Sequence, residues 1–320
     1  MSRKTKIWLI TAASFILLGC IIFGGAMTVL KWDFTKLSTV KYETNRYEID
    51  ESYKNISIVT DTADVVFMPS EGLMTSVVCY EFKNAKHSVE VKDDTLVVRV
   101  ADTRKWYEHI GIYFGSPKVT VYIPQGEYGE LLIKGDTGSV EIPEFLKFKS
   151  IDVSESTGSV TNYASASEDI KIKTSTGAVC VENVSANSLD LCVSTGKVTV
   201  FSVTCGDVKV NVSTGKTEFT DIKCKNVVSG GSTGDILLKN VIAAQTLSVV
   251  RSTGDVKLEG CDAADMSLKT STGSVKGSLL SDKVFITQTD TGSIDVPKTA
   301  TGGKCEINTD TGDIKISVLD

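Results

Sequence analysis

A tripeptide of Ser or Asp, then Thr, then Gly occurs ten times after residue 135. Successive glycines of this tripeptide are 19 residues apart in six intervals and 20 apart in three. Such a regular interval indicates an internal repeat, and it is too short for two full helices. The chain is therefore expected to be built mainly by stacking coils. The glycines are Gly138, Gly158, Gly177, Gly196, Gly215, Gly234, Gly254, Gly273, Gly292 and Gly312.

Each repeat carries two segments with the alternating pattern of a half-buried strand. The residue two positions after each glycine is β-branched, which favours strands. A second apolar column precedes the next tripeptide, so each coil supplies at least two inward-facing strands. The first column is Val140, Val160, Val179, Val198, Thr217, Ile236, Val256, Val275, Ile294 and Ile314, and the second is Ile151, Ile170, Leu189, Val208, Val227, Leu247, Met266 and Phe285.

The tripeptide suits a corner between strands. Glycine reaches positive φ without a Cβ clash, and a Ser or Asp side chain can accept a hydrogen bond from the backbone about two residues on. Coils stacked at ~4.8 Å would form a rod of roughly 50 Å. The predicted fold class is all-β, with a β-solenoid of about ten 19–20-residue coils over residues 135–320. A β-sandwich is the alternative, but sandwiches rarely keep one register through ten copies.

Residues 7–30 contain no charged side chain and are long enough, as a helix, to cross the bilayer hydrocarbon. Arg3, Lys4 and Lys6 precede this segment. The positive-inside rule therefore predicts a cytoplasmic stub at residues 1–6 and an extracytoplasmic chain from about residue 31. This topology is that of a single-pass signal-anchor protein in the plasma membrane.

Two processing alternatives exist for the apolar segment. Gly24 and Ala26 form a small-residue cleavage site of the kind that ends a signal peptide. The Leu-Leu-Gly-Cys sequence that ends at Cys20 is similar to a lipoprotein processing site. Residues 21–23 continue the apolar run beyond that cysteine, which favours an uncleaved membrane helix.

The region between the apolar segment and the repeats is less regular. Residues 31–48 are polar and are predicted to be a short spacer. Residues 49–134 contain strand-like segments without the strict period, and we expect them to form irregular opening coils or a capping β-subdomain, because an exposed sheet edge needs a cover. The last coil has no obvious cap in the sequence. Its free end is therefore predicted to be either a surface for oligomerisation or for a partner, or a frayed end that its terminal carboxylate keeps from pairing.

The composition argues against two classes of partner. The 320 residues have a net charge of −6 and no long basic run. A nucleic acid or an anionic lipid surface is therefore not expected as the main partner.

The eight cysteines follow the repeat register rather than a disulfide or metal pattern. Cys205 and Cys224 occupy a column otherwise filled by alanine, and Cys261 occupies an apolar column, so all three are predicted to be buried thiols. Adjacent coils point their side chains the same way, which is a poor geometry for an unstrained disulfide. Cys180 and Cys192 have outward parity and are the candidates for a bridge or for reactive thiols.

No metal or cofactor site is expected from the sequence. There is no Cys-x-x-Cys pair, and His87 and His109 are the only histidines.

Three copies of the tripeptide spell Asp-Thr-Gly, the sequence of the aspartic-protease active site. They end at Gly138, Gly292 and Gly312, and their Asp136, Asp290 and Asp310 replace Ser at one corner of the repeat. A protease would need two such carboxylates to face each other and share a proton. Stacked corners instead lie in a line and face outward. Other acids that a carboxylate enzyme could use are predicted to be solvated surface residues: Asp207, Asp221, Asp235 and Asp255. No catalytic residue is predicted.

The chain resembles a family of bacterial β-strand-repeat domains of unknown function with an adhesin label, which includes LiaG-like envelope proteins. The resemblance is carried by residues 56–58, the Val-Thr-Val-Tyr-Ile-Pro segment at 119–124 and the repeated Ser-Thr-Gly-x-Val coils. It covers roughly residues 49–320. It implies a surface-exposed protein of the bacterial envelope, and it supplies no catalytic positions.

These observations favour a non-catalytic interaction, scaffold or adhesin-like module that binds an envelope protein or a surface polymer. One alternative is an accessory sensor of envelope stress. Because its cytoplasmic stub is short, such a sensor would have to signal through a membrane partner. The other alternative is a polysaccharide-cleaving solenoid enzyme.

Overall fold

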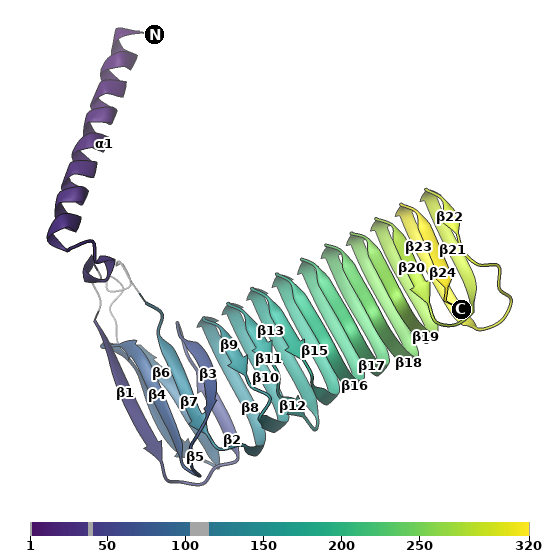
Figure 1. The fold of residues 1–320 in the computed structure, drawn as a ribbon, viewed down its shortest axis with the longest axis horizontal. Helices are drawn as coiled ribbons and strands as arrows, with labels where there is room; N and C mark the ends of the chain where they lie inside the picture. Colours follow the sequence, from purple (N-terminus) through teal and green to yellow (C-terminus); the bar gives the residue numbers. More distant parts are fainter. Residues whose placement is uncertain (1, 38–40, 103–114, 320) are drawn as a thin grey trace.

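The chain folds into a rod of stacked β coils with a single long helix at its N-terminal end (Figure 1). The computed structural model describes residues 2–37, 41–102 and 115–319. His109 lies outside these residues. The prediction of an all-β solenoid preceded by one apolar helix is confirmed.

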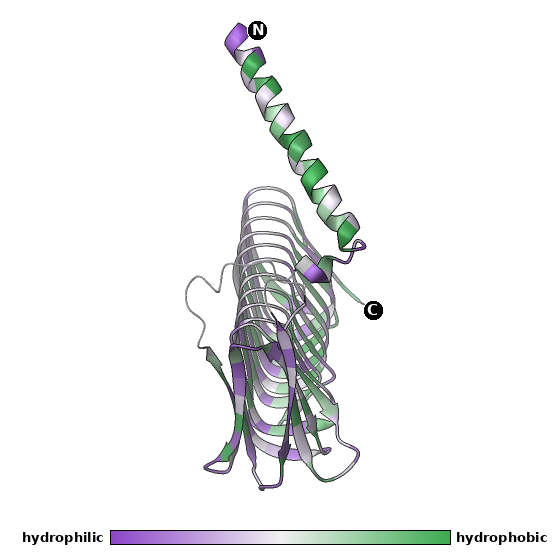
Figure 2. Ribbon diagram, turned by 90° about the vertical axis from the view of Figure 1, so that its left-hand side faces the viewer, coloured by the Kyte–Doolittle hydropathy of each residue, from purple (hydrophilic) through white to green (hydrophobic). Residues whose placement is uncertain are grey.

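The helix α1 (Arg3–Val29) begins after Ser2, whose hydroxyl accepts a hydrogen bond from the backbone N–H of Thr5 at 3.2 Å. Its side chains are exposed almost throughout. Figure 2 shows a helix whose ribbon is mainly green or pale, the colours of hydrophobic and intermediate residues, beyond its hydrophilic first turn. An 18-residue window of this helix has a mean hydropathy of 2.4, and the 27 residues are long enough to cross a membrane. These properties are consistent with a single-pass anchor or a signal peptide. A short 3₁₀ helix, η1 (Phe34–Leu37), follows.

Seven strands form the end of the rod that adjoins the helix. β1 and β7 pair antiparallel with β4, and β5 pairs antiparallel with β6. β2 and β3 instead run parallel to the first solenoid strands, so they join this region to the stack. The seven are β1 (Tyr42–Ile49), β2 (Asn55–Val59), β3 (Asp64–Pro69), β4 (Thr75–Phe82), β5 (Ala85–Lys92), β6 (Thr95–Asp102) and β7 (Lys118–Ile123).

The strand β1 lies where the sequence analysis placed a polar spacer. It is an edge strand, paired on one side only within the described chain. Glu43, Arg46 and Glu48 supply the charge that makes this segment read as a spacer. Charged side chains are typical of edge strands, because they discourage further pairing.

All the remaining strands pair in parallel. The two sides of each coil merge into one long bent strand in the middle of the stack. The strands are β8 (Gly126–Thr137), β9 (Val140–Ile142), β10 (Leu146–Thr157), β11 (Val160–Asn162), β12 (Ser165–Ala166), β13 (Asp169–Thr176), β14 (Val179–Glu182), β15 (Ser185–Thr195), β16 (Val198–Thr214), β17 (Thr217–Thr233), β18 (Ile236–Thr253), β19 (Val256–Thr272), β20 (Val275–Leu279), β21 (Lys283–Thr291), β22 (Ile294–Asp295), β23 (Gly303–Thr311) and β24 (Ile314–Val318).

The tripeptide glycines lie directly on one another at one edge of the rod. Each has a φ between +129° and +156°, and a Cβ on any of the nine after Gly138 would collide with the carbonyl oxygen of the glycine in the neighbouring coil. Only glycine allows both this φ and this approach. The predicted column of β-branched residues is also in register, as the pairing of Val198 with Val179 and Thr217 shows.

The coils at the C-terminal end do not follow the order of the sequence. β19 and β20 pair with β23 and β24, and β21 and β22 pair with the other side of β23 and β24. The coil of residues 283–295 is therefore outermost, and the last coil in the sequence lies inside it (Figure 1). Our prediction that the last coil forms the free end is wrong.

Burial gives a physical reason for this exchange. Cys305, Ile307 and Ile314 of the inserted coil are fully buried between two neighbours. In the outermost coil Phe285 lies opposite Cys305, Thr287 lies opposite Ile307, and Ile294, opposite Ile314, remains 45% exposed. The inner place thus covers Ile307 on both sides, and the place with one open side is taken by Thr287. The end that we assigned to oligomerisation is formed by β21 and β22.

Candidate functional site

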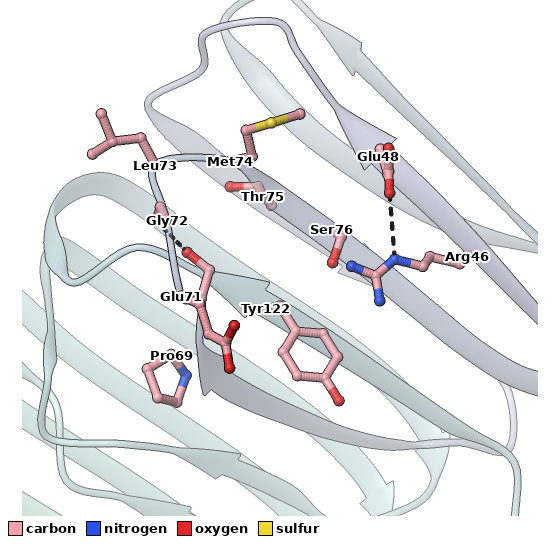
Figure 3. Close-up of a pocket in the computed structure, with 11 residues that line it drawn as sticks. Arg46, Glu48, Pro69, Glu71, Gly72, Leu73, Met74, Thr75, Ser76 and Tyr122 are labelled. Atoms are coloured by element: carbon pink, nitrogen blue, oxygen red, sulfur yellow. Dashed lines mark hydrogen bonds and ion pairs between the residues drawn. The ribbon is translucent and has the colours of Figure 1, made fainter.

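A groove lies beside the turn between β3 and β4, at the N-terminal end of the rod (Figure 3). We call residues 70–74 the tip and the concave surface next to it the tip groove. The cavity volume is about 680 Å³. The tip groove is lined by Arg46, Glu48, Pro69, Ser70, Glu71, Gly72, Leu73, Met74, Thr75, Ser76 and Tyr122.

The tip is an apolar projection held by short-range hydrogen bonds. The Ser70 hydroxyl donates to the carbonyl oxygen of Gly72 at 2.6 Å, and the buried Thr75 hydroxyl lies 2.6 Å from the Tyr53 hydroxyl. Leu73 is 94% exposed and Met74 is 56% exposed. Figure 3 shows Leu73 projecting away from the strands. Exposed apolar side chains that are clustered and rimmed by polar groups are typical of a contact surface.

The polar rim of the tip groove does not form a catalytic set. Arg46 Nε lies 3.6 Å from Glu48 Oε1, and both side chains are mostly exposed. Glu71 is exposed as well. Neither carboxylate has the low-dielectric surroundings by which a protein tunes a general acid.

A second groove, of about 720 Å³, lies near the other end and is crossed by a column of three lysines. Lys257, Lys276 and Lys315 stand opposite one another on β19, β20 and β24. Each has an acidic partner. Lys257 pairs with Glu259 at 2.7 Å, Lys276 with Asp313 at 3.4 Å and Lys315 with Asp295 at 3.9 Å. The positive charge of this column is thus largely compensated, which disfavours it as an anion site.

The three Asp-Thr-Gly corners are exposed, as predicted. Asp136, Asp290 and Asp310 all lie on the outer edge of the stack. Asp290 and Asp310 belong to neighbouring coils because Thr291 pairs with Thr311, but their strands run in the same direction. They do not form the buried facing pair of an aspartic protease.

The four other acids weighed as catalytic candidates are exposed and serve the stack. Each accepts a hydrogen bond from the next coil, at 2.7–2.9 Å. The donors are the Asn226 and Asn240 amides and the backbone N–H groups of Asp255 and Ser274. The acceptors are Asp207, Asp221, Asp235 and Asp255, in that order.

All eight cysteines are free thiols. Cys261 is buried, as predicted, whereas Cys205 and Cys224 are only partly buried. Cys180 is on β14 and Cys192 is on β15, and these two strands do not pair with each other. Burial raises the pKa of Cys180, and it raises the pKa of Cys205 to about 12 and that of Cys224 to about 11. Since the thiolate is the reactive form, these residues are poorly suited to redox chemistry.

Glu155 is a buried carboxyl group that the sequence analysis did not single out. It is 5% exposed, and neither carboxylate oxygen has a hydrogen-bond partner within the described chain. Burial, together with the negative charges of Asp136 and Asp64, raises the pKa of Glu155 to about 7. Perturbed carboxyl groups often mark active sites. Glu155, however, lies against Gly135 of the preceding coil and lines neither groove.

The raised pKa predicts a pH-dependent stability. Protonation of Glu155 stabilises the folded state relative to the unfolded state. This stabilisation is complete below 4.5, the ordinary pKa of the carboxyl group, and is lost as the pH rises to about 7. Over this interval the free energy of unfolding should fall by roughly 3 kcal/mol. We therefore expect Glu155→Gln to be more stable than the parent at pH 8 and similarly stable at pH 5. Denaturant unfolding at both pH values measures this, and an equal difference at both would contradict it.

The structure also joins three residues that no sequence motif connects. Cys79 and Glu81 on β4 meet His87 on β5, and all three are buried. The spacing of these residues in the sequence did not reveal the cluster, because its members lie on two strands that only the hairpin brings together. The available signal was the Cys-x-Glu pair, whose members point to one face of a strand.

A family model described as Toastrack DUF4097 matches residues 53–217 and 203–320. The chain belongs to the Toastrack DUF4097 family. This membership confirms the resemblance to a β-repeat domain of unknown function. No curated protein matches the chain.

Three solved structures are similar to this Toastrack chain at low identity. A candidate adhesin from Bacteroides fragilis NCTC 9343 is 17% identical, with a TM-score of 0.43, over 87% of this chain and 97% of that one. A candidate lipid-binding protein from Parabacteroides distasonis ATCC 8503 is 18% identical, with a TM-score of 0.46, over 75% and 95%. A candidate adhesin from Parabacteroides merdae ATCC 43184 is 12% identical, with a TM-score of 0.47, over 75% and 97%. These values are too low to carry a functional inference.

Proposed function

We propose that this chain is a membrane-anchored, extracytoplasmic interaction module of the bacterial envelope that binds an envelope protein or a surface polymer without catalysing a reaction. The observation that carries this proposal is the tip. It presents Leu73 and Met74 to solvent beside a groove, and Leu73, at 94% exposed, is the most exposed large apolar side chain among the described residues. Large exposed apolar side chains in a cluster are costly to keep in water unless they are used for contact.

The arrangement of the rod supports a tethered role. The apolar helix α1 lies at the end of the chain that carries Arg3, Lys4 and Lys6, which favours a cytoplasmic N-terminus. The stacked coils then extend the module away from the helix (Figure 1). A stiff rod with a shared core keeps a binding surface at a constant orientation and loses little entropy on binding.

The chemistry of the described residues supports a non-catalytic role. The exposed acids on the edges accept hydrogen bonds between coils, and Glu155 is enclosed in the stack. A polysaccharide-cleaving enzyme would need two carboxyl groups that flank the bond to be broken, one of them tuned as an acid. Glu48 and Glu71 at the tip groove are both exposed to water.

Crosslinking the full-length protein in its own cells, followed by mass spectrometry of the attached species, tests the proposal. We expect the parent to capture a discrete envelope protein or surface polymer. The double variant Leu73→Asp/Met74→Asp should lose most of that capture, because two charges replace the apolar contact. Both side chains are exposed, so the substitutions should leave folding unchanged.

The matched control is Val228→Asp/Val250→Asp on the flat face of the rod. Val228 is 47% exposed and Val250 is 48% exposed. Lys209 and Lys269 lie next to them in the neighbouring coils. The control should capture the partner as the parent does. If the tip variant captured the partner as well as the parent does, the tip would not be part of the binding surface. If the parent captured no partner, the proposal itself would be contradicted.

A further inference from the structure

The β4–β5 hairpin gathers a thiol, a carboxylate and an imidazole in the interior of the N-terminal end. Cys79 and Glu81 are two residues apart on β4, so their side chains point to the same face. The hairpin closes at the pairing of Phe82 with Ala85, which brings His87 back alongside them. Cys79 and Glu81 are fully buried, and His87 is 4% exposed.

The three side chains converge on one point. One ligand atom of each, the Cys79 sulfur, a Glu81 carboxylate oxygen and a His87 ring nitrogen, lies within 4.8 Å of the other two. Glu81 Oε2 is 2.6 Å from His87 Nδ1 and also accepts the His87 backbone N–H at 2.6 Å. Thiolate, carboxylate and neutral imidazole together form a donor set that Zn²⁺ binds in proteins.

The remaining polar atoms of these ligands already have partners. The Asn45 side-chain amide donates to Glu81 Oε1 at 2.6 Å, which leaves Oε2 as the inward oxygen. The Thr60 hydroxyl lies 3.2 Å from His87 Nε2, which leaves Nδ1 as the inward nitrogen. Metal-binding histidines and carboxylates typically have such outer hydrogen bonds, which hold each ligand in orientation.

There is room beside the cluster for one small additional ligand. A cavity of about 10 Å³ lies on the Glu81 and His87 side of the cluster, away from Cys79, and is also lined by Thr60 and Asp61. This volume is close to what one water molecule requires. Three protein ligands and one water would complete a tetrahedral zinc site.

We propose that Cys79, Glu81 and His87 form a binding site for a thiophilic divalent cation of the Zn²⁺ class. On binding, the Cys79 S–H bond is replaced by a sulfur–metal bond, and the proton passes to solvent. The His87 N–H shifts from Nδ1 to Nε2, where it donates to Thr60, while Nδ1 and Glu81 Oε2 move apart to admit the cation. The site then ties β4 to β5 and stabilises the end of the rod to which the helix is joined.

The test uses the full-length protein, freed of metal with a chelator and then titrated with Co²⁺ or Zn²⁺. We expect one equivalent of Co²⁺ to give the visible absorption of a tetrahedral site together with a near-ultraviolet thiolate-to-cobalt band. One equivalent of Zn²⁺ should displace this spectrum and raise the thermal midpoint.

Two cysteine variants separate the site from other thiols. Cys79→Ala should abolish the thiolate band, whereas Cys305→Ala, which removes an equally buried thiol from the core of the repeats, should retain it. If Cys79→Ala folds poorly, Cys79→Ser, which keeps the size of the side chain and removes the thiolate, is the second variant and should also lack the band. Absence of stoichiometric binding by the parent, or a thiolate band that persists in Cys79→Ala, would overturn the proposal and leave a hydrogen-bonded Glu81–His87 core pair.

Discussion

Val198→Asp is expected to abolish cooperative unfolding of the repeat region. Val198 is fully buried between Val179 and Thr217 of the two neighbouring coils. An aspartate there would place a carboxylate in the core without a partner, and it would also lose the burial of the valine side chain. The two effects together should cost more than about 4 kcal/mol. Thermal unfolding of the full-length protein, followed by far-ultraviolet circular dichroism, measures the loss.

A matched substitution on the same strand controls for the added charge. Thr204 is an exposed β-branched residue of β16 that lies between Ser185 and Lys223. Thr204→Asp introduces the same side chain on the outside, next to a lysine. It should leave the unfolding midpoint nearly unchanged. An unaltered unfolding midpoint for Val198→Asp would mean that the Val198 side chain does not point into the core.

Gly215→Ala should destabilise the rod by about 3 kcal/mol or more. Gly215 has a φ of +146°, and an added Cβ would lie 1.9 Å from the carbonyl oxygen of Gly196. Both the backbone strain and the collision follow from a single methyl group. Because the neighbouring atom is backbone, the coils themselves would have to separate. Denaturant unfolding of the variant and the parent measures the difference.

A second glycine in the neighbouring coil provides the control. Gly230 lies within β17 without positive φ, and an added Cβ there would meet only the Asn211 side-chain oxygen at 3.5 Å. Gly230→Ala should therefore be neutral, or should stabilise the fold by up to about 1 kcal/mol by restricting the unfolded chain. Equal losses for Gly215→Ala and Gly230→Ala would show that the corner has no special requirement for glycine.

The repeat region of the fold could be predicted, because each coil there packs against coils with the same sequence pattern. A 19-residue period with a β-branched residue after each corner glycine is enough to place Val198 in the core, because the coils above and below repeat the pattern. The same reasoning failed at the ends. β1 reads as a polar spacer because an edge strand carries charges, and only its pairing with β4 reveals it.

The candidate sites were less predictable than the fold. The exposed tip could not be distinguished from other turns, since exposure depends on which strands flank it. The cluster of Cys79, Glu81 and His87 depends on a hairpin turn that brings two strands together. Glu155 has the inward parity of Ile151 and Val153, and Gly135 in the preceding coil leaves the space that its side chain occupies.

The sequence by itself determined the stacking, the two inward columns, the glycine corners and the apolar N-terminal helix, because each depends on local periodicity or on one uninterrupted segment. Tertiary structure alone decided the order of the last coils. The Asp-Thr-Gly corners at Gly292 and Gly312 are locally equivalent, so either coil could follow β19 and β20. The inner place covers Ile307 on both sides, whereas the outer place leaves one side open at Thr287, which lies opposite Ile307 and whose hydroxyl tolerates water better than an isoleucine side chain would.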